Sequence, residues 1–140
     1  MKDDASITAA LISAGRSVRI TPHGNSMLPL LDGKNDSVVV GPLRGTPKKG
    51  DLVLFRDGEG ALVLHRVIRV NAESRACDML GDGNVTPERE IPSERIIGQA
   101  ESICRKGRAF SVRHPLFVLY GWIWTRTVRL RARLLRLIKQ

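Results

Sequence analysis

Residues 49–68 read KGDLVLFRDGEGALVLHRVI, and this stretch decides the fold. Two apolar runs, Leu52–Arg56 and Leu62–Val70, flank the turn-forming sequence Asp57-Gly58-Glu59-Gly60. Short apolar runs bounded by Gly and Asp are typical of strands, and a short Gly-containing loop between two of them is typical of a β-hairpin. We therefore predict a hairpin here. The first run is apolar without interruption, which indicates a strand buried on both faces.

Further short apolar runs bounded by turn-forming residues lie on either side of this hairpin and are predicted to be strands. Residues 4–14 are predicted to be helical instead, because Ile7, Leu11 and Ile12 recur at helical spacing before Gly15. The sequence therefore predicts a mainly β, compact domain with a short N-terminal helix. The further predicted strands are Ser17–Pro22, Ser37–Val40, which is also expected to be buried on both faces, Arg75–Leu80 and Ile96–Cys104.

The charge of the chain is concentrated at one end. The chain has 140 residues, which indicates one domain. Residues 1–101 hold 13 Lys and Arg against 14 Asp and Glu, whereas residues 102–140 hold ten Lys and Arg and no acid. The neutral body argues against a DNA-binding face, so a nucleic-acid partner is not expected. The basic tail favours an anionic partner.

The tail has the pattern of a basic amphipathic helix. His114-Pro115 interrupts the chain, and a helix-compatible run with an arginine stripe and Tyr120, Trp122 and Trp124 follows. We divide the chain into a body, residues 1–113, and a helix, residues 114–140. Two interpretations stay open for this helix. It lies on an anionic membrane surface through residues 115–140, or it packs its apolar face on the body.

No apolar run approaches the roughly 20 residues that a membrane span requires. The N-terminal sequence also lacks the pattern of a signal peptide. The expected location is therefore cytoplasmic or peripherally membrane-associated. The two cysteines, Cys77 and Cys104, make no metal-binding motif, so no metal site is expected.

Three segments of the body carry residue types that can perform catalysis. Ser26 lies in the turn-like sequence Gly24–Pro29, His65 lies in the second apolar run, and Asp82 lies in Gly81-Asp82-Gly83-Asn84. A serine, a histidine and an aspartate fit the roles of nucleophile, base and orienting group. Each is more often a turn or strand residue when taken alone, and spacing does not show that the three meet.

The order of the sequence boxes resembles the serine peptidases of the signal peptidase I and LexA-type self-cleaving repressor group. Their Ser-Met-x-Pro box matches Ser26-Met27-Leu28-Pro29. Their later boxes match Lys49–Phe55, Leu64–Ile68 and Gly81–Asn84, in the same order. Bacterial signal peptidase I and the repressors have a lysine base where this chain has His65. In this respect the chain is similar to the archaeal and endoplasmic-reticulum signal peptidases.

This resemblance implies a serine endopeptidase of signal-peptidase-like type that cleaves a precursor peptide or protein. Ser26 would be the nucleophile, His65 the base and Asp82 the orienting acid, although Glu88 remains open for the last role. The resemblance implies no metal or organic cofactor. Activity should then rise between about pH 5.5 and 7.5, the ordinary range of histidine. Further expected roles are backbone oxyanion donors at Asn25 and Ser26, and a substrate cleft shaped by Met27 and Pro29.

The sequence departs from the family pattern at two points, and a second function stays open beside the peptidase. The N-terminal membrane anchor of signal peptidases has no counterpart in the sequence, and no helix-turn-helix precedes the body. The alternative is a non-catalytic module of the same fold that binds an extended peptide and is docked to a membrane or a partner by its basic tail.

Overall fold

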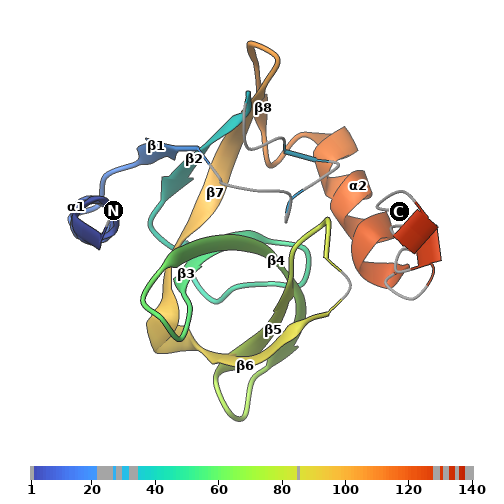
Figure 1. Ribbon diagram of the computed structural model, residues 1–140, viewed down its shortest axis with the longest axis horizontal. Coiled ribbons are helices and arrows are strands. Elements are labelled where there is room, and N and C mark those ends of the chain that lie inside the picture. The colour runs from blue at the N-terminus through green and yellow to red at the C-terminus, as the bar shows by residue number, and fades with distance from the viewer. Residues whose placement is uncertain are drawn as a thin grey trace.

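The computed structural model describes residues 2–21, 27, 30–31, 35–84, 86–127, 130, 133–134 and 136–137, with side chains from Ala5 onward. These residues form a mainly β structure between two helices (Figure 1). The elements in chain order are α1 (Lys2–Ser13), β1 (Val18–Ile20), β2 (Ser37–Gly41), β3 (Leu52–Arg56), β4 (Leu62–Asn71), β5 (Ala76–Leu80), β6 (Glu88–Pro92), a 3-10 turn (Ser93–Arg95), β7 (Ile96–Arg105), β8 (Arg108–Ser111) and α2 (Pro115–Arg126).

The described strands form one antiparallel sheet in the order β1-β2-β7-β3-β4-β5-β6, and β8 pairs with β7. Strands β3 to β7 curve round into a barrel-like half, while β1, β2 and β8 extend from it along β7 (Figure 1). Register shifts in four of the strand pairs accompany this curvature. Such bulges increase local twist and bend a strand, which lets a sheet turn back on itself.

The mainly β class with a short N-terminal helix and a C-terminal helix is confirmed. The predicted hairpin is also confirmed, because β3 pairs with β4 from Leu52↔Arg66 to Arg56↔Leu62. Strands β6 and β8 were not predicted. The first begins Glu-Arg-Glu, and every residue of the second is exposed, so neither shows the apolar run of a buried strand.

Strand β3 separates two hydrophobic clusters. Leu52 and Leu54 belong to the first cluster, and Val53 and Phe55 belong to the second. Alternate residues of a strand point to opposite faces, so the uninterrupted apolar run does reflect burial on both sides. Strand β2 was expected to behave in the same way, and this prediction is wrong. Val38 and Val40 are buried but Val39 is only half-buried.

Helix α1 packs against the sheet where β7 has a glycine. Ile12 is almost completely buried, and its Cγ2 would lie 3.2 Å from a Cβ added at Gly98. The same Cβ would come within 2.4 Å of the Gly41 carbonyl oxygen, which is far inside contact distance. Glycine at position 98 therefore permits the close approach of β2 and α1 to β7.

We expect Gly98→Ala to lower the free energy of unfolding by about 1–3 kcal/mol, because backbone must shift to admit the methyl group. Gly58→Ala is the matched control, since nothing lies within 4 Å of a Cβ at that position and its φ is not in the left-handed region. Urea denaturation of both variants measures the difference. Equal stability of the two proteins would contradict the packing argument.

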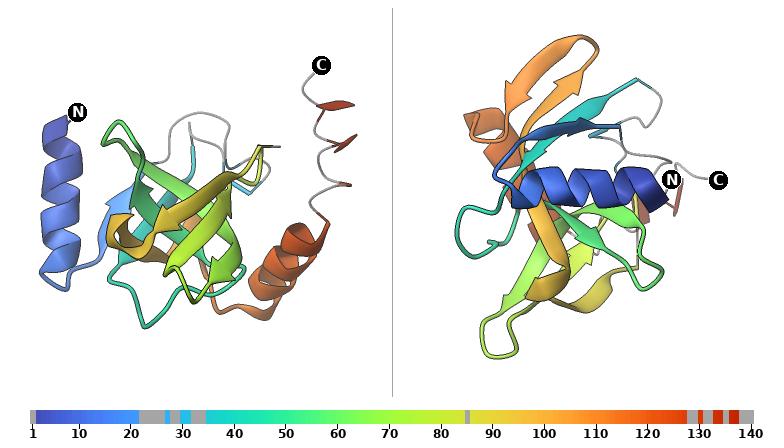
Figure 2. Two further views of the ribbon diagram at one scale, coloured as in Figure 1. Left: turned by 90° about the horizontal axis from the view of Figure 1, so that it is seen from below. Right: turned by 90° about the vertical axis from the view of Figure 1, so that its left-hand side faces the viewer.

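Helix α2 begins at Pro115, directly after the predicted break. His114 caps it, because its Nδ1 accepts a hydrogen bond from the Leu116 backbone N–H at 3.1 Å. The two helices lie on opposite sides of the sheet structure (Figure 2). None of the helices formed by the described residues is long and apolar enough to cross a membrane.

Candidate active site

The predicted nucleophile segment is only partly described. Ser26, Asn25 and Pro29 lie outside the described residues. Met27 is described, and its side chain is 2% exposed within the first hydrophobic cluster. Met27 was expected to shape the substrate cleft, but it is a core residue. Leu64, which precedes His65 in β4, belongs to the same cluster.

Strand register brings a carboxylate to His65. In β4 and β5 Val67 pairs with Met79, and in β5 and β6 Met79 pairs with Glu88. His65 lies two residues from Val67, on the same face of β4, so Glu88 reaches it across β5. Glu88 Oε1 lies 3.1 Å from His65 Nδ1. Nδ1 makes no hydrogen bond. At this distance, that means the Glu88 oxygen does not lie along the direction of a ring N–H.

Burial keeps His65 neutral. The residue is 5% exposed, and its ring packs against Phe55 with the ring centroids 5.8 Å apart. Desolvation lowers the pKa of His65 to about 4, and the negative charge of Asp82 opposes this shift. The sequence predicted an ordinary histidine pKa, which this burial corrects. Desolvation also raises the pKa of Glu88, with a further contribution from the charge of Asp57.

Asp82 does not lie beside His65 as the resemblance implied. Its Oδ1 accepts a hydrogen bond from Arg66 Nε, and its Oδ2 accepts one from Arg66 Nη2, both at 2.8 Å. Consecutive residues of a strand point to opposite faces, so the partner of Arg66 lies away from His65. Glu88, the alternative that the sequence left open, is the carboxylate that contacts the imidazole.

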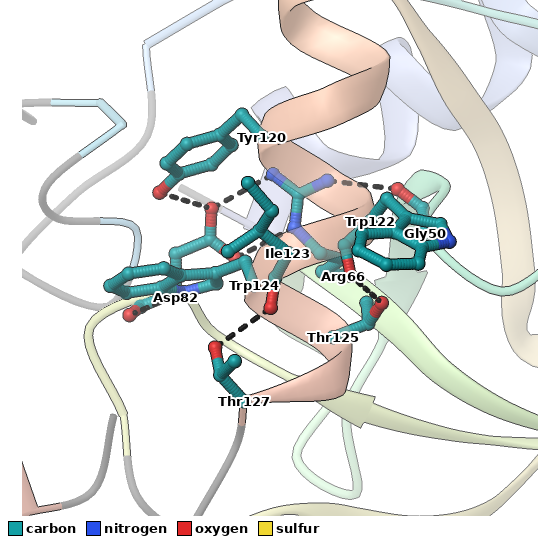
Figure 3. A network of polar contacts seen from close by, with 9 residues as sticks. All are labelled: Gly50, Arg66, Asp82, Tyr120, Trp122, Ile123, Trp124, Thr125 and Thr127. Atoms are coloured by element: carbon teal, nitrogen blue, oxygen red, sulfur yellow. Dashed lines mark hydrogen bonds and ion pairs between the residues drawn. The ribbon is translucent and has the colours of Figure 1, made fainter. Parts of the chain in front are cut away.

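Helix α2 closes the Arg66–Asp82 pair, and both side chains are completely buried (Figure 3). Arg66 Nη1 also donates to the Gly50 carbonyl oxygen at 2.8 Å. From the helix, Tyr120 Oη donates to Asp82 Oδ2 at 3.2 Å, and Trp124 Nε1 donates to the Asp82 carbonyl oxygen at 3.1 Å. These hydrogen bonds compensate the burial of both charges.

Gly121 permits the close approach of the helix to the guanidinium. A Cβ at this position would lie 2.7 Å from Arg66 Nη1, which three hydrogen bonds of the guanidinium hold in place. The ring of Tyr120 also lies 5.3 Å from the guanidinium carbon, within cation–π range. The side of α2 that faces the body therefore fits closely against this ion pair.

Sequence reasoning did not identify Arg66 as a structural centre. The signal was present, because an arginine directly follows His65 inside the apolar run Leu62–Val70. A charged residue inside a buried strand requires a buried partner of opposite charge. Asp82 was therefore available as a partner for the arginine as well as for the histidine, and only the alternation of β4 separates the two possibilities.

We expect protonation of the unfolded chain to reduce stability below pH 6.5. His65 has a folded pKa of about 4 against 6.5 unfolded, so the unfolded state binds the proton first. The His65 contribution is complete above pH 6.5 and is lost as the pH falls toward 4. Urea denaturation should show wild type losing about 2–3 kcal/mol more than His65→Gln between pH 7 and 4.5.

This comparison isolates the histidine. Glu88 has a raised pKa and so favours the folded state as the pH falls, but it is present in both proteins. An identical pH dependence for wild type and His65→Gln would show that His65 titrates normally. It would contradict the burial of the ring.

A cavity of about 240 Å³ lies between α2 and the neighbouring strands. Neither His65 nor Glu88 lines it, so it is separate from the candidate catalytic pair. Its lining includes Lys49, Asp51, Gln99, Phe117, Trp122 and Arg126.

Comparisons with known proteins returned no match to a family model, a curated protein or a solved structure.

Proposed function

We propose that this protein is a serine endopeptidase of signal-peptidase-like type, in which Ser26 is the nucleophile, His65 the base and Glu88 the orienting carboxylate. The observation that supports it most is the buried, neutral His65 with Glu88 at its Nδ1. A histidine in this state can accept a proton at neutral pH. The resemblance of Ser26–Pro29 to the Ser-Met-x-Pro box supplies the nucleophile.

The mechanism proposed is acyl transfer. Glu88 beside Nδ1 favours the tautomer with its proton on that atom, which leaves the Nε2 lone pair free. Ser26 Oγ attacks the peptide carbonyl carbon while its proton passes to Nε2. The same proton then goes to the leaving amine as the C–N bond breaks. Water hydrolyses the ester by the reverse transfers, and serine and neutral histidine are regenerated.

Two carboxylates support the charged intermediate in this mechanism. The imidazolium that forms during attack is disfavoured by burial, because desolvation already lowers the pKa of His65. The negative charge of Asp82 offsets part of this cost. Glu88, whose Oε1 lies 3.1 Å from Nδ1, is placed to stabilise the imidazolium directly. The assigned role of Glu88 is to position and stabilise the ring, and the role of Asp82 is to hold Arg66.

A non-catalytic peptide-binding module is the second candidate. The observation that favours it is the buried Nδ1 of His65, which makes no hydrogen bond. A module of this kind needs no activated histidine and can bind an extended peptide through the sheet. In catalysis, by contrast, the Nδ1–Glu88 contact must become an aligned hydrogen bond when substrate binds.

A fluorophosphonate probe distinguishes the two functions. The peptidase predicts a covalent adduct at Ser26, located by mass spectrometry of the digested protein, and no adduct with His65→Gln. We expect Glu88→Gln to slow labelling at least tenfold, with unfolding by urea checked in parallel. Absence of an adduct on folded wild-type protein, or an adduct at another serine, would contradict the assignment.

A further inference from the structure

Helix α2 has one side that the body does not cover. Phe117, Tyr120, Gly121 and Trp124 face the body, as their burial and contacts show. The remaining surface of the helix is apolar and between 44% and 70% exposed; its residues are Leu116, Val118, Leu119, Trp122 and Ile123. Val118 and Trp122 lie at its border, where they also line the cavity beside the body. A contiguous exposed apolar surface of this kind marks an interaction site.

The exposed apolar character continues beyond α2. Leu130, Leu134 and Leu137 are helical residues with roughly half or more of their surface exposed. Among them Arg133 and Arg136 are helical and exposed as well. Leucine and arginine are therefore interspersed among the described residues after α2. This combination is characteristic of helices that lie in a membrane interface.

The charge around this surface selects the partner. Residues 102–140 hold ten Lys and Arg and no Asp or Glu. Two copies meeting through α2 would bring these positive charges together, which disfavours self-association. An anionic bilayer complements them. Arg126 lies over the ring of Trp122, with 4.4 Å from its guanidinium carbon to the ring centroid, so a cation and an amphipathic ring occur together.

We propose that the outward side of α2, Leu116, Val118, Leu119, Trp122 and Ile123, docks on an anionic phospholipid bilayer while the inward side stays bound to the body. The inward contacts are hydrogen bonds from Tyr120 and Trp124 to Asp82, and withdrawal of the helix would expose the fully buried Arg66–Asp82 pair. The helix thus inserts one tryptophan and retains the other. This inference stands independently of the proposed peptidase activity.

Sedimentation with vesicles tests the docking. We expect full-length protein to bind phosphatidylglycerol/phosphatidylcholine vesicles at 50 mM salt, and to bind at least tenfold more weakly at 500 mM salt or to pure phosphatidylcholine. Leu119→Glu should weaken binding at least tenfold. Ile7→Glu is the matched control, because Ile7 is 58% exposed on α1 and Leu119 is 51% exposed. It should change binding less than twofold.

Tryptophan fluorescence tests whether the helix stays on the body. The chain has two tryptophans, so each single replacement leaves one reporter. Trp124→Phe retains Trp122 and should show a blue shift with anionic vesicles. Trp122→Phe retains Trp124 and should show none. If Trp124→Phe does not fold, quenching by brominated lipid compares wild type with Trp122→Phe and gives the same information.

Three outcomes would overturn the proposal. The first is full-length protein that stays in the supernatant with anionic vesicles at low salt. The second is concentration-dependent dimerisation that Leu119→Glu abolishes, in the absence of lipid binding. The third is insertion of both tryptophans, which would mean that α2 leaves the Arg66–Asp82 pair. Each readout is independent of probe labelling at Ser26, so it can fail while the proposed function stands.

Discussion

Replacing Ser26 with alanine is expected to reduce peptide cleavage by a factor on the order of 10⁴ or more. In the proposed mechanism this hydroxyl forms the bond to the acyl carbon, and no other group can replace it in that step. Stability should change by less than about 0.5 kcal/mol, because a single hydroxyl in a turn sequence contributes little to folding. The family resemblance implies small residues at the substrate positions P1 and P3. The assay is therefore cleavage of a peptide library with small residues at these positions, followed by mass spectrometry.

Ser74→Ala is the matched control for this variant. Ser74 is an exposed serine in the turn between β4 and β5, and its hydroxyl donates to Glu90 and not to a catalytic candidate. It should cleave at the wild-type rate. Cleavage by Ser26→Ala at that same rate would exclude Ser26 as the nucleophile, whatever the result with His65→Gln.

Replacing Arg66 with methionine is expected to lower the free energy of unfolding by about 3–5 kcal/mol. The change leaves the Asp82 carboxylate completely buried without its bidentate partner, and it also removes the bond to Gly50. Such a loss is a large part of the stability of a small domain. Urea denaturation measures it. Arg69→Met is the control, because Arg69 is exposed on the same strand and should change stability little.

A variant without the charges of both Arg66 and Asp82 distinguishes the loss of the ion pair from the cost of one buried, unpaired charge. Arg66→Met combined with Asp82→Leu should recover part of the lost stability, because no unpaired charge remains in the core.

Asp82→Asn tests the role implied by the family resemblance. If Asp82 oriented His65, this variant would lose catalytic rate with its stability unchanged. The structure predicts that stability falls with the Arg66 contacts.

The fold was more predictable from sequence than the site. Strand β3 and its hairpin follow from an uninterrupted apolar run and a glycine-containing turn, both of which are local signals. The contact between His65 and Glu88 depends on the register of β4, β5 and β6, and β6 itself has the composition of a loop. Register is fixed by packing across the sheet, which no local pattern reports.

The C-terminal helix shows a different limit of sequence reasoning. Its two interpretations, membrane surface and packed helix, were treated as exclusive. In the structure the inward side packs on the body and the outward side remains exposed. A helix with apolar residues on both sides gives a weak amphipathic pattern. The polar tips of Tyr120 and Trp124 distinguish the sides only once Asp82 is known to be beneath them.

Because α2 covers the ion pair and follows it in the chain, its position also determines the order in which the parts of the protein fold during synthesis. Strands β3 to β5, which carry Arg66 and lead to Asp82, leave the exit tunnel before the segment that seals them. Until Tyr120 and Trp124 emerge, the nascent body holds two strongly charged groups at an unsealed edge of its core. Final closure is thus timed by translation, because chains fold progressively as they are synthesised. A released chain that ends at residue 113 would present a body that proteases cleave more readily than the full chain, because nothing then seals the Arg66–Asp82 pair.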